Sequence, residues 1–391
     1  MKTIPDREIT RRVRSLCELL KAKDVNFALI FQNTDRFYFT GTLQDGVLLV
    51  PTDGRSPVLF IKRTLERALE ESPLENIIGF TDIREVYEYI WDQELDPATV
   101  GLEMDIIPAK FYLNLLRSFP QTRFVDISKE IRSIRAIKSE FEIDIMREGG
   151  RRLDNVLEKL LKELKPGRTE YDVYRKLTDL FYEQEALLHI RTRSFSMESL
   201  PIHILSGQNA AKHSAMDSPS GGGDGISIAF PAGPGFRKLQ MGETVLIDVA
   251  FNYAGYNIDC ARVFAFGKID TIYERAHRVS NRCHELFLEK ARIGSYIPDV
   301  YNEIVEYVSK EGLSDVFMGG VKFIGHGVGL ELDEFPIITE NFKEYIQKGM
   351  VIAFEPKFIF DHGSAGYENT YYIVNEQAET LSHFEQSIHF L

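Results

Sequence analysis

The stretch TVLIDVAFNYAGYNIDCARVFAF, residues 244–266, predicts a β-hairpin with one aspartate in each strand. The first strand is mainly apolar, and Asp248 interrupts it. The tetrapeptide Asn-Tyr-Ala-Gly at 252–255 has the residues of a tight turn, and Asp259 lies in the returning strand. A turn centred in the middle of this tetrapeptide makes Asp248 and Asp259 face each other across the hairpin.

Two facing carboxylates in an apolar hairpin require a positive partner. Cross-strand neighbours have Cβ atoms about 4.5–5.5 Å apart, and like charges at that distance are unfavourable. Carboxylates among apolar residues are costly unless they are paired or bind a metal. No lysine or arginine stands beside Asp248 in the sequence. The pattern therefore predicts a cation between Asp248 and Asp259.

The stretch VIAFEPKFIFDHGSAGYENTYYIV, residues 351–374, repeats this arrangement. Glu355 and Glu368 lie in successive strands, and the Asp-His-Gly turn at 361–363 places them opposite each other. For one such pair, an exposed strand face or a core acid bonded to a backbone amide is as good an explanation as a metal. Two pairs in separate hairpins favour metal binding.

A histidine completes the predicted ligand set. His326 lies in FIGHGVG, residues 323–329, where glycines on both sides let backbone and ligand approach closely. Four carboxylates and one imidazole suit two ions of the Mn²⁺, Co²⁺, Fe²⁺ or Zn²⁺ type. Two such ions about 3.5–4 Å apart can activate one water molecule.

Length and composition limit the alternatives. A chain of 391 residues predicts two domains, and 44% hydrophobic with 27% charged residues is a globular composition. The net charge of −13 argues against a nucleic-acid-binding surface. No apolar run approaches the roughly 20 residues that span a bilayer. Three widely spaced cysteines and a charged N-terminus without a signal peptide predict a cytoplasmic protein.

The pattern of elements changes near residue 135. Residues 1–135 alternate helix and strand signals and predict a small α/β domain. Residues 136–391 predict a larger α+β domain with antiparallel strands backed by helices. This larger part begins with a capping box, Ser139 with Glu142, ahead of a long amphipathic helix. The glycine-rich stretch 219–235 predicts a loop without the signature of a phosphate-binding loop.

The motifs LIDVAFNYAGYNIDCAR, GHGVGLELDEFP, FEP and YENT resemble those of the pita-bread metallopeptidases, which include aminopeptidase P and prolidase. The N-terminal third resembles the creatinase-like domain of the prolidase branch. The resemblance implies a pita-bread catalytic domain over 136–391, preceded by a creatinase-like α/β domain over 1–135. It also implies a homodimeric, metal-dependent hydrolase that cleaves the Xaa-Pro bond of dipeptides or of longer N-termini.

The resemblance implies a role for each predicted ligand of a two-metal centre, with manganese favoured. Asp248 would bind one ion and His326 the other, and Asp259 and Glu368 would bridge them. Glu355 would complete the second ion and act as general base.

The resemblance implies substrate contacts as well. The segment SGQNAAKH, residues 206–213, matches a family stretch that ends in a substrate-contacting histidine, which makes His213 a catalytic and substrate-binding candidate. Asp333 stands where the family has a histidine, and it is a second substrate-binding candidate. An ionised carboxylate accepts hydrogen bonds and donates none, so Asp333 cannot replace an imidazole donor.

Two further departures concern neighbouring positions. The family's Asp-x-Thr-Arg pattern has Ala261 in place of threonine, and Gly366 stands where the prolidase branch often has arginine. These departures leave room for a metal-dependent non-peptidase of the same fold, a lyase or C–N hydrolase acting on a small molecule. A non-catalytic binding module is a third alternative, and the complete ligand set and acidic charge disfavour it.

Overall fold

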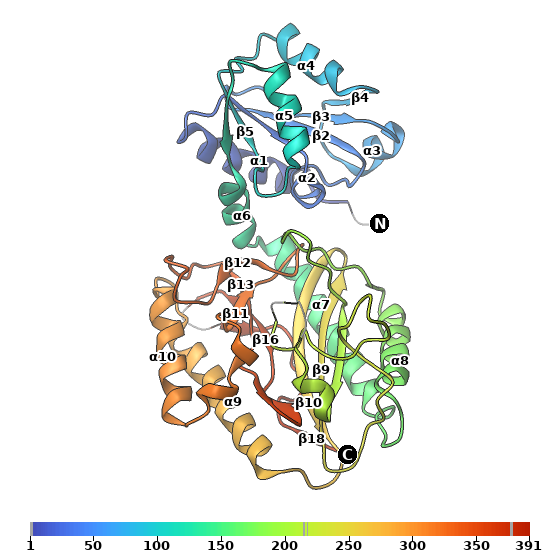
Figure 1. The fold of residues 1–391 in the computed structure, drawn as a ribbon. Helices are drawn as coiled ribbons and strands as arrows, with labels where there is room; N and C mark the ends of the chain where they lie inside the picture. Colours follow the sequence, from blue (N-terminus) through green and yellow to red (C-terminus); the bar gives the residue numbers. More distant parts are fainter. Residues whose placement is uncertain (1–2, 214–215, 217, 376–377) are drawn as a thin grey trace. The chain divides into compact units, whose positions relative to one another are not determined.

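The computed structural model describes residues 3–213, 216, 218–375 and 378–391. The chain divides into two compact units, Met1–Arg135 and Ala136–Leu391 (Figure 1). Among the described residues, no helix has the length and apolarity needed to cross a membrane.

The first unit is built on one mixed sheet. Its strands are β1 (Phe27–Ile30), β2 (Gly46–Pro51), β3 (Val58–Ile61), β4 (Ile77–Gly79), β5 (Thr99–Leu102) and β6 (Arg123–Asp126), in the order β4-β3-β2-β1-β5-β6. Its helices are α1 (Asp6–Lys21), α2 (Asn33–Thr40), α3 (Leu65–Glu71), α4 (Ile83–Asp92), α5 (Ala109–Ser118) and α6 (Ser128–Ala136), the last of which ends at the boundary.

Helices cover the sheet of the first unit on both faces. A core cluster joins α4 and α5 to alternate residues of the central strands, such as Phe27, Leu29 and Leu49. Helices α1 and α2 contact β2. The strand patterns read from the sequence match this sheet, but helix α2 had no predicted counterpart. It has 8 residues, and the side chain of Gln32 caps it by accepting a hydrogen bond from Asp35 N.

In the described part of the second unit the long helices are α7 (Glu140–Leu160), α8 (Glu170–Glu183), α9 (Thr271–Lys290) and α10 (Ile297–Lys310). The predicted capping box is confirmed, because the Ser139 hydroxyl accepts from Glu142 N and the Glu142 carboxylate accepts from Ser139 N. The same motif, Thr169 with Asp172, begins α8. The short 3-10 helices among the described residues are η1 (Gly207–Ala211), η2 (Ser314–Val316) and η3 (Met318–Gly320).

Two sheets form the centre of this unit. One contains β7 (Ala186–Leu187), β8 (Ile202–Ser206), β9 (Thr244–Tyr253), β10 (Tyr256–Ala265) and β18 (His389–Phe390). The other contains β11 (Gly325–Gly327), β12 (Glu334–Ile337), β13 (Val351–Phe354), β16 (Asn369–Ile373) and β17 (Ala378–Thr380), and β14 (Phe358–Phe360) pairs with β15 (Gly363–Ala365). Helices α7 and α8 pack on the first sheet, and α9 and α10 share a core with the second (Figure 1).

Candidate metal centre

The β9–β10 hairpin places two aspartates on one face of a sheet. Asp248 lies opposite Ala261, and Asp259 lies opposite Ala250. The predicted direct pairing of Asp248 with Asp259 was therefore wrong. Because the true register differs from the predicted one by two positions, both side chains still share a face. They are diagonal neighbours, a relation that corresponds to about 7–8 Å.

The turn explains this register. Tyr253 pairs with Tyr256, so the loop contains only Ala254 and Gly255. Their φ angles are 49° and 96°, and two-residue hairpin turns with positive φ at both positions match the twist of the flanking strands. The sequence contained this signal in Gly255, one position later than the predicted turn centre.

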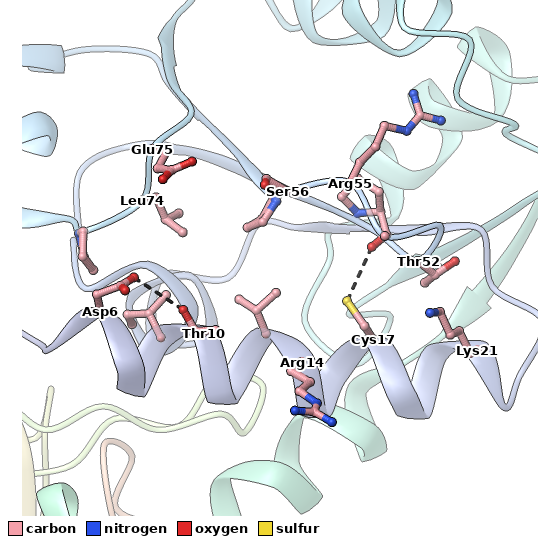
Figure 2. A pocket seen from close by; sticks show the side chains of 16 residues that line it. Asp6, Thr10, Arg14, Cys17, Lys21, Thr52, Arg55, Ser56, Leu74 and Glu75 are labelled. Atoms are coloured by element: carbon pink, nitrogen blue, oxygen red, sulfur yellow. Dashed lines mark hydrogen bonds between the residues drawn. The ribbon is translucent and has the colours of Figure 1, made fainter.

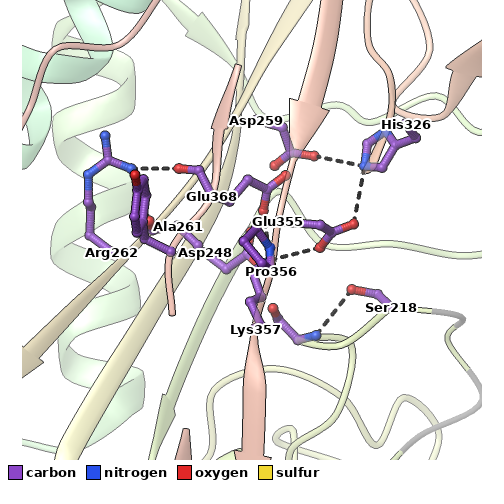
Figure 3. Close-up of polar contacts among 12 residues, drawn as sticks. Ser218, Asp248, Asp259, Ala261, Arg262, His326, Glu355, Pro356, Lys357 and Glu368 are labelled. Atoms are coloured by element: carbon purple, nitrogen blue, oxygen red, sulfur yellow. Dashed lines mark hydrogen bonds and ion pairs between the residues drawn. The ribbon is translucent and has the colours of Figure 1, made fainter. Parts of the chain in front are cut away.

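The second pair of acids confirms the predicted register. Val351 lies opposite Tyr372 and Phe354 lies opposite Asn369, so Glu355 and Glu368 continue the same alignment one residue beyond the paired strands. Glu368 also forms a backbone bridge with Ala261 of the other sheet. This bridge brings the second hairpin against the first and places all four carboxylates together (Figure 3).

Buried groups hold Glu368 in this position. Arg262 is fully buried and donates to Glu368 O at 2.6 Å and to Phe384 O at 3.0 Å. The departure at Gly366 has a structural cause. Gly366 has a φ of +97°, and a Cβ atom there would lie 2.4 Å from Pro356 O. A larger side chain at 366 would therefore require a different backbone path.

His326 reaches the acids from β11. Its Nε2 atom lies 3.7 Å from Asp259 Oδ2 and 3.7 Å from Glu355 Oε1. Its Nδ1 atom lies 3.0 Å from Gly327 O. A proton donated from Nδ1 to that carbonyl leaves the lone pair of Nε2 facing the carboxylates, as metal ligation requires.

A lysine lies inside the cluster. Lys357 is fully buried, and its Nζ atom donates to Asp248 Oδ2 at 2.7 Å, Glu355 Oε2 at 2.9 Å and Glu368 Oε2 at 2.6 Å (Figure 3). The absence of a basic residue near Asp248 in the local sequence was therefore misleading. Glu355 and Lys357 are two positions apart, in the short segment that joins β13 to β14. That spacing was the available signal.

The charges of the cluster oppose each other. Burial lowers the pKa of His326, but the carboxylates of Asp333, Glu355 and Glu368 outweigh burial, and the net shift is upward. Burial and the nearby Glu368 and Asp248 carboxylates raise the pKa of Asp259 well above its usual range. Burial also raises the pKa of Glu368 to about 8, against the effect of Lys357. These upward shifts indicate that Lys357 and His326 do not balance all four carboxylates.

Three of the predicted ligands fit one metal ion. Asp259, His326 and Glu368 are buried, and each offers a ligand atom within 4.8 Å of those of the other two. The Oε1 atom of Glu368 is buried without a hydrogen-bond partner among the described residues. An unpaired carboxylate oxygen beside an imidazole nitrogen and a second carboxylate is a suitable donor set for a borderline divalent ion.

Asp248, Asp259, Glu355 and Glu368 surround a small cavity of about 50 Å³, called the acids' cavity below, which has room for a few water molecules. His203, Leu200, Phe323 and Leu332 also line it. The Asp333 carboxylate lies at its wall, with Oδ1 3.4 Å from His326 Nδ1. His203 was not predicted, although a histidine between Ile202 and Ile204 in an apolar strand was a visible signal.

His213 lies elsewhere. Its side chain is exposed and lines a neighbouring cavity of about 230 Å³ together with Gly319 and Ile359. Met216 and Ser218 line both cavities. His213 is thus placed beside the acids' cavity and not in its wall.

A larger cavity of about 700 Å³ lies in the first unit (Figure 2). Its lining mixes charges of both signs, including Asp6, Arg14, Lys21 and Arg55, with the thiol of Cys17. It contains no histidine and no group of opposed carboxylates among the described residues. Size alone does not make it the reactive site, so we place the chemistry at the smaller cavity.

Both units of the chain match known protein families. Residues 144–375 match the model of metallopeptidase family M24, and residues 12–137 match the creatinase/prolidase N-terminal domain. The Xaa-Pro dipeptidase of Pyrococcus furiosus is 24% identical over 380 residues, covering 96% of this chain and 99% of the relative. An uncharacterised peptidase of Staphylococcus haemolyticus is 25% identical over 385 residues, covering 96% of this chain and 99% of the relative.

Solved structures share the fold. An Xaa-Pro dipeptidase from Bacillus anthracis superposes with a TM-score of 0.82 at 20% identity, covering 98% of this chain and 100% of that one. The prolidase of Pyrococcus horikoshii gives 0.80 at 22% identity, covering 96% and 99%. The predicted fold, a pita-bread domain preceded by a creatinase-like domain, is confirmed.

Proposed function

Since the chain belongs to metallopeptidase family M24, we propose that this hydrolase cleaves the Xaa-Pro bond of dipeptides or of peptide N-termini. The observation that supports this proposal is the buried cluster of four carboxylates and His326 around one small cavity. The names of several relatives, Xaa-Pro dipeptidase and prolidase, point to the same substrate class.

The side chains of the centre have different roles in the proposed hydrolysis. Asp259, His326 and Glu368 would hold a divalent ion, which polarises a carbonyl oxygen and makes water a better nucleophile. Glu355 is the general base that takes a proton from the attacking water and delivers it to the leaving nitrogen. Lys357 holds Oε2 of Glu355 at 2.9 Å, which directs Oε1 toward the His326 side of the cavity.

The two neighbouring cavities suit a substrate that extends past the cleaved bond. The scissile bond would lie in the small cavity, and the remainder would reach His213 across Met216 and Ser218. Asp333 accepts hydrogen bonds but donates none, so the complementary substrate group is a donor. The protonated amine of a peptide N-terminus is such a group.

The small volume at the acids and the positive charge already supplied by Lys357 favour one second candidate, a C–N hydrolase that acts on a small molecule. In that case the cavity would hold the entire substrate, and His213 would take no part. The fold hosts unrelated reactions, so the substrate must be decided by assay.

The test is hydrolysis of an Xaa-Pro dipeptide and an Xaa-Pro-Xaa tripeptide, each beside its Xaa-Ala counterpart, with Mn²⁺, Co²⁺ or Zn²⁺ added. We expect release of the residue before proline and at least tenfold less release from the alanine peptides. The His326→Ala variant is the matched inactive control. Wild-type protein that retains metal but cleaves neither proline peptide would contradict the proposal and favour the second candidate.

The remaining expectations stand as proposals. Manganese as the preferred metal, a homodimer and a cytoplasmic location come from the sequence and the resemblance. The number of ions, two in the prediction, depends on the part that Lys357 takes in the centre.

A further inference from the structure

Lys357 makes the closest contacts in the acid cluster. Its Nζ atom lies within 2.9 Å of one oxygen each of Asp248, Glu355 and Glu368. The side chain is fully buried, and three carboxylates use all three donors of the ammonium. A lysine is almost never buried without such pairing, so the local fold depends on these contacts.

These oxygens are also the ones that a metal ion on the Asp248 side of the centre would require. A divalent ion binds carboxylate oxygens at about 2.0–2.2 Å, a contact even shorter than that of the ammonium. An ion that shared Asp248 Oδ2 and Glu368 Oε2 with Lys357 would lie beside the ammonium in a buried site. Two cations on the same oxygens repel each other strongly where water is excluded.

The other side of the centre is free of this competition. The two carboxylate oxygens of Glu368 differ in their contacts: Oε2 accepts a hydrogen bond from Lys357, and Oε1 has no hydrogen-bond partner among the described residues. The ligand atoms of Asp259 and His326 lie near Glu368, and neither side chain has an ion pair with Lys357. Four ionised carboxylates opposed by one ammonium leave a net charge of −3, so the centre still attracts a divalent cation.

We propose that the Lys357 ammonium takes the place of one of the two metal ions, so that the centre binds a single divalent ion at Asp259, His326 and Glu368. Asp248 then serves as the partner of Lys357 and not as a metal ligand. This inference rests on the proposed metal dependence, but not on the identity of the substrate.

The first experiment counts metal. The experiment compares wild type with Lys357→Ala and Lys138→Ala. Each protein is loaded with Mn²⁺ or Zn²⁺ and freed of excess metal, and its metal content is measured by elemental mass spectrometry and by titration calorimetry. Lys138 is the matched control, because it is also buried and paired, to Glu334 at 2.9 Å. We expect one ion per chain for wild type and Lys138→Ala, and two for Lys357→Ala, where the vacated oxygens can bind the second.

A second pair of variants keeps the test decisive if Lys357→Ala does not fold. Asp248→Asn should retain the single ion with an affinity within about threefold of wild type, since it alters only the lysine's partner. His326→Ala should lose the ion or bind it at least 100-fold more weakly. Calorimetry measures both without reference to activity.

The outcomes separate this inference from the proposed function. Two ions per wild-type chain, or loss of an ion in Asp248→Asn, would overturn the role of Lys357 even if Xaa-Pro peptides are cleaved. No ion in the wild type would overturn it as well. If the wild type binds one ion per chain but cleaves no peptide, the role of Lys357 is supported and the proposed Xaa-Pro substrate is contradicted.

Discussion

His203 lies directly opposite Asp248 in the antiparallel pairing of β8 with β9. The two side chains therefore share the face of the sheet that lines the acids' cavity. His203 is only 7% exposed, and its Nδ1 atom has no hydrogen-bond partner among the described residues. The side chain of His203 thus lies at the wall of the acids' cavity as the cross-strand neighbour of a carboxylate there.

We predict that His203→Asn lowers kcat/KM by about 100-fold, the lower range for loss of a group that transfers a proton or binds the reacting atoms. Metal content should stay at the wild-type value, because His203 is outside the ligand set. Steady-state kinetics with a metal count measures both. His383→Asn, at an exposed position, is the control. An unchanged kcat/KM in His203→Asn would show that this histidine has only a structural role in the cavity wall.

A variant at Asp333 tests whether its carboxylate binds the protonated amine of the substrate. Removing its charge with Asp333→Asn should raise KM for peptides with a free N-terminus by about tenfold, equal to about 1.4 kcal/mol, with little change in kcat. The KM should change less for substrates whose amine is acetylated. A fall in kcat at constant KM would instead mean that Asp333 acts by orienting His326, 3.4 Å away.

His277 makes stability depend on pH. Its Nε2 atom lies 2.7 Å from Gln386 O, and burial lowers the pKa of His277 from 6.5 to about 4. Between these values the unfolded chain binds a proton that the folded protein does not, so stability falls as pH drops below 6.5. This group alone should cost about 2 kcal/mol of unfolding free energy between pH 7.5 and pH 5.

The measurement is denaturation in urea at both pH values for wild type and His277→Gln. The glutamine amide can still donate to Gln386 O but does not titrate in this range. We expect the loss of stability at pH 5 to be smaller in His277→Gln by that amount. His383→Gln should behave as wild type, and an identical pH dependence in all three proteins would refute the assignment.

Two adjacent glycines in α7 give a prediction about packing. A Cβ atom at Gly150 would lie 1.8 Å from Leu381 O, whereas one at Gly149 would lie 3.2 Å from the side chain of Ile258. Gly150→Ala should therefore destabilise the protein by about 1–3 kcal/mol or more, since backbone must move. Gly149→Ala is the comparison, because its side-chain neighbours need to shift by only a few tenths of an ångström and alanine favours the helix by about 1 kcal/mol. Equal thermal midpoints for the two variants would contradict this contact.

Much of the fold was predictable because its signals are local. Capping boxes, apolar periodicity and turn residues act within a few positions of the chain, and they identified the long helices and the two hairpins that carry the acids, but not the short helix α2. The alignment of Glu355 with Glu368 also followed from one short turn. The register of Asp248 with Asp259 did not, because the choice between adjacent turn positions depends on the φ angles of Ala254 and Gly255.

The sequence by itself identified five side chains of this cluster, four acids among apolar residues and a histidine between glycines, because such groups are costly to bury without a cation. It did not identify His203 or Lys357. The tertiary structure alone decided which cation each acid meets. Lys357 is 109 residues from Asp248 along the chain, and the bridge between Ala261 and Glu368 brings their hairpins together. Contacts across such distances arise from the packing of two sheets, which no local pattern of residues records.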